Sequence, residues 1–417
     1  MKILFLSHYF PPEVNAPASR TYEHCRQWVE MGHDVTVVTC APNHPRGELY
    51  EGYSNKLVQR EVIDGISVIR LWTYVTANER VLKRTLNYLS YMLAVIAAAP
   101  FLPSADVVLS TSPQFFNGLA GYFVGHLKRA PWVLEIRDLW PESIVAVGAI
   151  RNRWIIGSLR WIERFAYRHA DAIVSVTGAF RQYMVEMNIS AEKIAVIPNG
   201  VDLDFYRPDD LEIRPIQEPG LSGKFVASYF GTLGMAHHLE TIMEAARLLR
   251  HRNDVVFLIV GDGAERDKLQ RLRDDAALDN VIMLEQQPKS KMPYWWQCSS
   301  ASMVLLRKSD LFKKVIPSKI FESMAMRKPI VLGVEGESRE IVAAAGAGVC
   351  ISPESACELA KRIVDLAGDP GWCEVLGRNG RQYVGEHYDR RVLAAQYEAL
   401  LHALACKSAP QRRSGPA

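Results

Sequence analysis

The sequence predicts an α/β protein built from two doubly wound domains, and three observations lead to this prediction. Short apolar runs rich in β-branched residues, such as KILFLS, DVTVVTC and VVFLIVGD, recur with amphipathic stretches between them. This alternation is typical of parallel sheets covered by helices on both faces. The 417 residues exceed what one hydrophobic core usually serves. The alternation also restarts after a segment rich in Asn, Gly, Asp and Pro, which indicates a domain boundary.

The domain boundaries follow from where the apolar runs stop and restart. We expect a Rossmann-like domain over residues 1–200, a linker over 201–220 and a second Rossmann-like domain over 221–389. The stretch RRVLAAQYEALLHALA predicts a closing helix over 390–405 that packs back on the first domain, followed by a disordered basic tail over 406–417. Ligands bind beyond the carboxyl ends of the strands in such sheets, so two facing domains would form a cleft.

Composition and charge argue against several classes of protein. Apolar residues make up 48% and charged residues 23% of the chain, which are ordinary values for a globular protein. The formal net charge of +3 is too small for a dedicated nucleic-acid binder. Seven cysteines without a Cys-x-x-Cys pair indicate reduced thiols in a cytosolic protein rather than disulfides or a zinc site. Neither G-x-G-x-x-G after the first strand nor G-x-x-x-x-G-K-[ST] occurs, so hydride transfer and ATP hydrolysis are disfavoured.

The segment VIPSKIFESMAMRKPIVLG, residues 315–333, combines features of a phosphate site. A helix starting near Ser318 would direct the N–H groups of residues 318–321 out of its end, where a phosphate can bind. Lys319 would add a positive charge there, and Glu322 could accept both hydroxyls of a ribose. Ordinary helix capping is the alternative, but a capping box needs its acid three residues after the cap, where this chain has an apolar residue. The pattern favours a nucleoside diphosphate as ligand.

Several stretches together resemble the retaining glycosyltransferases of family 4, which have the GT-B fold of two Rossmann-like domains facing across a cleft. These stretches include SHYFPPEVNAPASR, SPQFFNGLAGYF, VIPNGVDLDFY, YFGTLGMAHHLE, VVFLIVGDGAERDKL and VIPSKIFESMAMRKPIV. The run RDLWPES is similar to the branch containing aminofucosyl- and colanic-acid fucosyltransferases of bacterial surface polysaccharides. The resemblance covers about residues 1–400. It implies retaining hexosyl or aminohexosyl transfer from a nucleotide sugar in the second domain to an acceptor against the first.

The chain departs from the family pattern at two places. Glu322 falls on the second acid of the family's Glu-x7-Glu motif, but Lys314 stands where the first acid is expected. Where many members have an Arg and a Lys that grip the diphosphate, this chain has Thr232 and His237. The leaving phosphate must therefore draw its charge stabilisation from elsewhere, first from Lys319 and the helix end. His237 could assist if it were protonated.

The donor is expected to contact the loop GTLGMAHH as well as this helix. The predicted donor-binding residues are Gly231, Thr232, Gly234, His237, Ser318, Lys319 and Glu322. The glycines of GDG at 261–263 could face the nucleobase or form a tight turn. The Asp202-x-Asp204 spacing occurs in metal sites, but here it lies in a segment of turn-forming residues. We therefore expect no metal and no other cofactor.

The acceptor is expected near EIRDLWPES, which ends a strand and enters a loop. Asp138 or Glu142 could accept a proton from the acceptor hydroxyl, so these two residues and Lys319 are the candidate catalytic residues. Ordinary surface-loop chemistry is the alternative. Arg20, at the start of the first helix, could meet a phosphate or be solvated. The predicted acceptor-binding residues are Arg20, Arg137 and Asp138.

Two stretches suggest contact with a membrane. Residues 86–102, LNYLSYMLAVIAAAPFL, form either a buried helix of the first domain or a surface helix that dips into the lipid interface. The stretch RNRWIIGSLRWIERFAYRH has a composition suited to binding anionic headgroups or a lipid-linked pyrophosphate. The alternative is that it forms an ordinary solvated charged face. Its arginines lie near one helical stripe flanked by tryptophans: Arg153, Arg160, Arg164 and Arg168, with Trp154 and Trp161.

These features together predict a cytoplasmic enzyme, peripheral on the inner face of the cytoplasmic membrane. We expect it to use a nucleotide diphosphate sugar, UDP-linked and N-acetylated or else GDP-linked, and a polyprenyl-diphosphate-linked glycan acceptor. The expected process is synthesis of a bacterial surface polysaccharide such as capsule, O-antigen or exopolysaccharide, without a nucleic-acid partner. Two alternatives stay open, namely a nucleotide-sugar epimerase of the same architecture and a non-catalytic sugar-binding scaffold.

Overall fold

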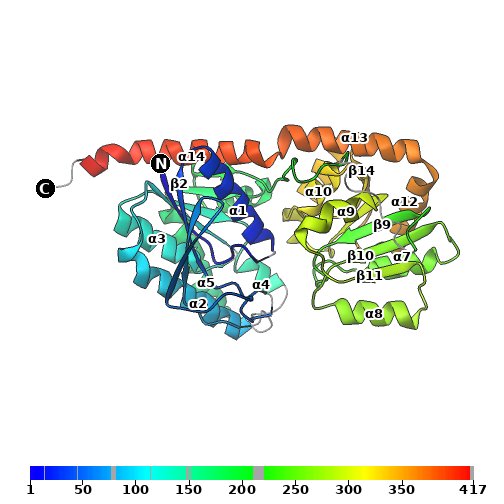
Figure 1. The fold of residues 1–417 in the computed structure, drawn as a ribbon, viewed down its shortest axis with the longest axis horizontal. Helices are drawn as coiled ribbons and strands as arrows, with labels where there is room; N and C mark the ends of the chain where they lie inside the picture. The colour runs from blue at the N-terminus through cyan, green and yellow to red at the C-terminus, as the bar shows by residue number, and fades with distance from the viewer. Residues whose placement is uncertain are drawn as a thin grey trace. The chain divides into compact units, whose positions relative to one another are not determined.

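The computed structural model divides into two compact units, one formed by Met1–Pro198 with Arg391–Ala417 and the other by Asn199–Arg390. The structure describes the whole chain except residues 14, 45, 77–80, 113, 147–149, 151, 210–219 and 414–417, and describes only the backbone at 81, 146 and 408–413. Each unit has one mainly parallel sheet flanked by helices, which confirms the predicted fold class (Figure 1). Half of the expected linker, 210–219, and the last four residues of the expected tail lie outside the described part.

The first unit contains an eight-stranded sheet in the order β3-β4-β2-β1-β5-β6-β7-β8. Only the β3–β4 pair is antiparallel, as in a hairpin added to the edge of a parallel sheet. The order reverses between β1 and β5, so the loops after these two strands flank a topological switch point, where α/β sheets bind ligands. The strands are β1 Lys2–Leu6, β2 Asp34–Cys40, β3 Val58–Ile63, β4 Ile66–Leu71, β5 Val107–Thr111, β6 Trp132–Ile136, β7 Ala172–Ser175 and β8 Ile194–Val196.

The last helix of the chain packs on the first unit beside α1 (Figure 1). The indole of Trp28 in α1 donates to the carbonyl of Ala394 at 3.1 Å, and Tyr397 and Leu401 join the core cluster of the first sheet. This helix runs to Arg413, so it extends into the segment expected to be a tail. The helices of the unit are α1 Ala16–Glu30, α2 Val81–Ala98, α3 Asn117–Lys128, α4 Glu142–Ala146, α5 Arg153–His169, α6 Gly178–Glu186 and α14 Arg390–Arg413, with 3₁₀ turns η1 Ala99–Phe101 and η2 Ala191–Lys193.

The second unit contains a six-stranded parallel sheet in the order β11-β10-β9-β12-β13-β14. Its order reverses between β9 and β12, so the loops that follow these strands lie side by side at a second switch point. The strands are β9 Phe225–Phe230, β10 Val255–Val260, β11 Val281–Leu284, β12 Ala301–Leu305, β13 Ile330–Gly333 and β14 Gly348–Cys350. The helices are α7 Glu240–Leu248, α8 Arg266–Asp275, α9 Met292–Gln297, α10 Lys319–Ala325, α11 Glu337–Ala345, α12 Ala356–Gly368 and α13 Pro370–His387, with η3 Lys289–Lys291 and η4 Phe312–Lys314.

Strand β9 shows how both faces of the second sheet are buried. Val226 and Phe230 point into one core cluster, which also contains the apolar face of α10. Ala227 and Tyr229 point into the opposite cluster, with residues of α7 and α12. Because alternate residues of a strand face opposite sides, a helix layer on each side explains the unbroken apolar run.

Candidate functional site

The loops after β9 and β10 pack against each other backbone to backbone, next to the second switch point. The N–H of Gly231 donates to the carbonyl of Val260 at 3.0 Å. A Cβ on Gly261 would lie 1.9 Å from the carbonyl oxygen of Gly231, and a Cβ on Gly263 would lie 2.5 Å from that of Leu233. Such distances exclude any side chain. The glycines of GDG are therefore explained by this close loop packing.

Lys319 reaches back from α10 to the glycine loop after β9. Its Nζ lies 3.6 Å from the ring centroid of Tyr229, and a Cβ on Gly231 would stand 2.9 Å from its Cε. Burial of the ammonium lowers the pKa of Lys319 to about 7, and the nearby Glu322 carboxylate acts in the opposite direction. Glu322 is half-buried on α10, so it is not sealed beneath the sheet. The fold thus brings Gly231, Lys319 and Glu322 together.

The start of α10 differs from the expected phosphate-binding helix end. Ser318 occupies the N-cap position, but its side chain makes no capping hydrogen bond, and the helix has only seven residues. The N–H of Ile320 donates to the carbonyl of Pro317 and the N–H of Phe321 to that of Ser318, each at 3.1 Å. The expectation that the N–H groups of residues 318–321 all point outward is therefore wrong for two of them.

His237 and Thr232 occupy the loop positions where many family members carry cations. Burial, together with the charge of Lys319, lowers the pKa of His237 to about 3, so its ring is neutral at physiological pH. Its Nδ1 lies 3.3 Å from the carbonyl oxygen of Leu305 and donates to it. The lowered pKa argues against a protonated His237 that assists the phosphate. Thr232 is exposed, and its carbonyl accepts from the Tyr229 hydroxyl at 2.8 Å, while Gly234 lies half-buried in the same loop.

The predicted acceptor residues follow β6 in the first unit. The N–H of Arg137 donates to the Ser112 hydroxyl at 2.7 Å, which ties the loops after β6 and β5 together. Asp138 is half-buried; burial raises its pKa, and nearby hydrogen-bond donors and the charge of Arg84 offset this in part. Glu142, the first residue of α4, accepts from the guanidinium of Arg160 in α5 at 3.0 Å. Asp138 thus lies near the edge of the sheet, whereas Glu142 takes part in a half-exposed ion pair.

An aromatic cluster beside Asp138 was not predicted from the sequence. It consists of Tyr9 after β1, Tyr88 on α2, Phe115 after β5 and Trp140 after β6. Trp140 lies 5.9 Å from Phe115 and 6.3 Å from Tyr88 between ring centroids, and the hydroxyls of Tyr9 and Tyr88 lie 3.4 Å apart. Arg84 adds a cation 5.5 Å from the Trp140 ring. The sequence does contain a signal for this cluster, because each of three strands is followed closely by an aromatic residue. The three segments are SHYFPP, SPQFFNG and RDLWPES.

Arg20 is buried in the first unit and its guanidinium is held by internal groups. Its Nε lies 3.1 Å from Oε2 of Glu135, a buried residue of β6. Its two terminal nitrogens donate to the carbonyls of Pro198 and Ile197 at 2.7 and 2.8 Å. These partners account for the position of Arg20 without a substrate.

The Asp-x-Asp stretch of the second unit closes a turn. Oδ1 of Asp202 accepts from the N–H groups of Asp204 and Phe205 at 3.0 and 3.1 Å, which is a local side-chain turn. Among the residues that the structure describes, no group of three or more His, Cys, Asp or Glu side chains could hold a metal ion.

Two family models match the chain, a glycosyl transferase 4-like domain over residues 15–200 and glycosyl transferases group 1 over residues 214–383. The chain belongs to the glycosyltransferases of family 4. It is thus an enzyme of a retaining family, as the sequence motifs implied. The two matches cover both units, including the glycine loop, Lys319 and Glu322.

Curated relatives of this family 4 glycosyltransferase include a protein named for the biosynthesis of colanic acid. A protein of Escherichia coli K12 named as a colanic acid biosynthesis glycosyl transferase, WcaI, is 24% identical, covering 85% of this chain and 89% of the relative. WbjE of Pseudomonas aeruginosa, named as a glycosyltransferase, is 27% identical over 73% of this chain and 76% of the relative.

Solved structures show the GT-B fold over nearly the whole chain. Sucrose-phosphate synthase of Thermosynechococcus elongatus superposes with a TM-score of 0.76 at 17% identity, covering 97% of this chain and 99% of that one. Anabaena HepE in complex with UDP-glucose superposes with a TM-score of 0.72 at 18% identity, covering 97% and 100%. WaaG, involved in lipopolysaccharide biosynthesis, gives 0.70 at 15% identity, covering 96% of this chain and 99% of WaaG.

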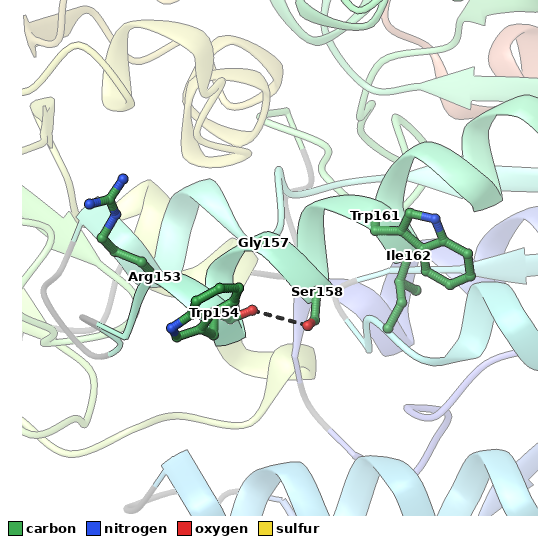
Figure 2. A pocket seen from close by; sticks show the side chains of 6 residues that line it. All are labelled: Arg153, Trp154, Gly157, Ser158, Trp161 and Ile162. Carbon is green, nitrogen blue, oxygen red and sulfur yellow. Dashed lines mark hydrogen bonds between the residues drawn. The ribbon is translucent and has the colours of Figure 1, made fainter.

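The first unit of this glycosyltransferase exposes large apolar side chains on α2 and α5. On α2, Tyr88, Tyr91 and Val95 are buried, while Leu82, Leu86 and Leu93 are exposed, so the helix is packed on one face only. On α5, Trp154 and Trp161 are 87% and 67% exposed. Both tryptophans line a hollow of about 900 Å³ with Arg153, Gly157, Ser158 and Ile162 (Figure 2). Within the described residues, no helix combines the length and apolar character needed to cross a bilayer.

Proposed function

We propose that this glycosyltransferase moves a sugar from a nucleoside-diphosphate sugar to a polyprenyl-diphosphate-linked glycan during synthesis of a bacterial surface polysaccharide. The use of a nucleoside-diphosphate sugar is supported by one observation. Lys319, Glu322 and the glycine loop after β9 lie together at the switch point of the second sheet. A buried cation stabilises a departing diphosphate, and a carboxylate one turn away can accept the ribose hydroxyls. The polysaccharide half of the proposal is supported by the name of the relative WcaI, which assigns that protein to colanic acid biosynthesis.

The nucleobase of the proposed donor has two supported candidates. HepE was solved with UDP-glucose, and a mycobacterial relative at 24% identity is named as a GDP-mannose-dependent mannosyltransferase. We favour a UDP-linked N-acetylated sugar and keep a GDP-linked sugar as the second candidate. Both present the same diphosphate to Lys319, so the proposed chemistry of the leaving group is independent of the base.

The proposed acceptor site lies at the carboxyl edge of the first sheet, around Asp138 and the aromatic cluster. A sugar ring has an apolar face that packs on aromatic rings and hydroxyls that bond to a carboxylate, and Trp140 and Asp138 offer these two kinds of surface. Asp138 is the proposed base for the acceptor hydroxyl. Its half-buried position gives it a raised pKa, which suits proton transfer near neutral pH better than a fully solvated carboxylate does.

We also propose that the enzyme is peripheral on the inner face of the cytoplasmic membrane and contacts it through α5. Two exposed tryptophans seven residues apart lie on a helix that also exposes four arginines, a combination suited to an anionic lipid interface. The four arginines are Arg153, Arg160, Arg164 and Arg168.

The donor proposal is tested by thermal-shift titration with a panel of nucleoside-diphosphate sugars, followed by a transfer assay with the one that binds. Glu322→Ala should weaken donor binding about tenfold or more, because it removes a charge-assisted bond to the ribose. Glu340→Ala, at an exposed position of the neighbouring α11, is the matched control and should bind as the wild type does. Equal binding by both variants would remove Glu322 from the donor site. Conversion of the donor without any acceptor would instead indicate an epimerase.

The membrane proposal is tested by flotation with vesicles of phosphatidylglycerol or of phosphatidylcholine. The wild type should float with the anionic vesicles only. The double variant Trp154→Ala, Trp161→Ala should stay at the bottom of the gradient, whereas Trp72→Ala, at a 43% exposed tryptophan outside α5, should behave as the wild type. Flotation of the double variant at the wild-type level would exclude α5 as the contact.

A further inference from the structure

The ammonium of Lys319 rests on a fixed aromatic surface. Its Nζ lies 3.6 Å from the centroid of the Tyr229 ring. Tyr229 is fully buried within β9, and its hydroxyl donates to the Thr232 carbonyl at 2.8 Å, so the ring is held at both ends. The stem of Lys319 passes along Gly231, where a Cβ would come within 2.9 Å of Cε. The absence of a side chain at Gly231 is what gives Lys319 its path to the ring.

The groups that act on the charge of Lys319 come from three elements. Glu322, one turn along α10, favours the ammonium. His237, in the loop after β9, is neutral because its pKa is lowered to about 3. Burial raises the pKa of Tyr229 in β9, so its hydroxyl is also neutral. Burial of Lys319 itself is the largest influence and lowers its pKa to about 7. At neutral pH the ammonium and the neutral amine are therefore both populated.

We propose that Tyr229 is a positioning residue of the donor site, whose ring face holds the Lys319 ammonium where the diphosphate of the donor arrives. An aromatic face attracts a cation through its quadrupole, and this attraction is strongest where water is excluded. The inference rests on the proposed function, because it takes a nucleoside diphosphate as the ligand. The chain from 225 to 246 contains no Lys or Arg, so β9 supplies the ring while neither β9 nor the loop after it supplies a cation.

Donor binding should then be linked to protonation of Lys319. The diphosphate brings negative charge next to the amine and favours its charged form, so each binding event takes up a fraction of a proton from solvent above pH 7. The dissociation constant should rise with pH once the free enzyme begins to lose the ammonium, and the slope approaches tenfold per pH unit. Loss of the Tyr229 ring should shift this rise of the dissociation constant to lower pH, because the Lys319 ammonium loses its aromatic partner.

The experiment is isothermal titration with UDP, GDP, dTDP and ADP between pH 7 and 9, a range in which the terminal phosphate is already largely ionised. For the nucleotide that binds, the wild-type dissociation constant should increase about tenfold per pH unit towards pH 9. Tyr229→Phe keeps the ring face and loses only the hydroxyl bond, so its profile should match the wild type. Tyr229→Leu should bind about tenfold more weakly at pH 7.5, with its rise displaced to lower pH.

Two further proteins keep the test decisive if Tyr229→Leu fails to fold. Replacement of Tyr229 by 3,4,5-trifluorophenylalanine preserves the shape of the ring but removes its negative face, so it should behave as the leucine variant does. Lys319→Arg keeps its charge at every pH in the range, so its dissociation constant should not vary with pH.

The inference is overturned if the fluorinated ring and Tyr229→Phe give the same dissociation constants and the same pH profile. It is also overturned if Lys319→Arg retains the wild-type pH dependence, since the titrating group would then lie elsewhere. Failure of all four nucleotides to bind the wild type would overturn the proposed donor class itself, and this result is distinct from the other two.

Discussion

Arg20 and Glu135 form an ion pair at 3.1 Å in which both side chains are buried. Oε1 of Glu135 also accepts from the hydroxyl of Thr111 at 2.8 Å, and the guanidinium donates to the carbonyls of Ile197 and Pro198. The pair therefore connects α1 to β5, to β6 and to residues 197–198, which follow β8. A buried ion pair with further hydrogen bonds to both partners is expected to act on folding rather than on substrate.

Arg20→Ala should lower the free energy of unfolding by ~3–5 kcal/mol, because it leaves the Glu135 carboxylate buried without its cation. Urea unfolding followed by circular dichroism measures this. Arg26→Ala on the same helix is the control; its pair with Glu30 is a partly exposed i,i+4 contact, so the loss should stay below ~0.5 kcal/mol. Normal stability of Arg20→Ala combined with weaker use of the acceptor would restore Arg20 to the substrate site.

Gly261→Ala should disturb the donor loops, because its Cβ would lie 1.9 Å from the Gly231 carbonyl oxygen. We expect a loss of ~1–3 kcal/mol in unfolding free energy from this overpacking, and weaker nucleotide binding because Gly231 must move away from Lys319. Gly368→Ala is the control at the end of α12 in the same unit, where a Cβ would meet no atom within 4 Å. Thermal unfolding with and without nucleotide measures both effects. Equal behaviour of the two variants would contradict the close loop packing.

The features predicted correctly from the sequence are those that depend on neighbouring residues. The apolar face of α10, with Ile320, Phe321 and Met324, follows from helical spacing, and all three are buried. The same spacing places Lys319 and Glu322 within one turn. The buried ion pair of Arg20 was not predicted, because its partner Glu135 is 115 positions away. The glutamate in the apolar strand WVLEI was the available signal, since a charge in a buried parallel strand requires a partner.

The remaining features depend on strand order, which the sequence does not reveal. Tyr229 meets Lys319 because β9 and β12 are neighbours, so the loop that leads from β12 to α10 starts beside the end of β9. The aromatic cluster likewise forms because β5 lies between β1 and β6. The neutral state of His237 follows from burial and from Lys319, and both depend on the tertiary structure.

Asp138→Asn should lower kcat by about 10²–10⁴-fold, the usual contribution of a general base, and leave donor binding unchanged. Because burial raises the pKa of Asp138, the wild-type kcat should increase with pH as the carboxyl loses its proton, and the variant should lack this increase. Glu142→Gln is the control, since Glu142 is half-exposed and paired with Arg160, and its kcat should change little. A large loss in Glu142→Gln alone would transfer the role to Glu142.

Glu163 on α5 should make the enzyme less stable as pH rises. Its carboxyl is buried and accepts from the Tyr167 hydroxyl at 3.0 Å, and burial raises its pKa from 4.5 to about 8. The unfolded chain therefore loses this proton near pH 4.5, whereas the folded chain keeps it until about pH 8. Between these values the stabilisation from this group is lost at ~1.4 kcal/mol per pH unit, because the folded state binds the extra proton.

Glu163→Gln removes this pH dependence while keeping a neutral acceptor for Tyr167. Relative to the wild type, the variant should gain unfolding free energy steadily from pH 5 to pH 8, measured by urea unfolding at three pH values in between. Glu186→Gln, at an exposed position of α6, should give a curve parallel to the wild type. If the pH curve of Glu163→Gln also runs parallel to that of the wild type, the carboxyl of Glu163 is charged in the folded protein, next to Tyr167. Such a result would also raise the negative charge near Asp138, because Tyr167 faces both carboxyls.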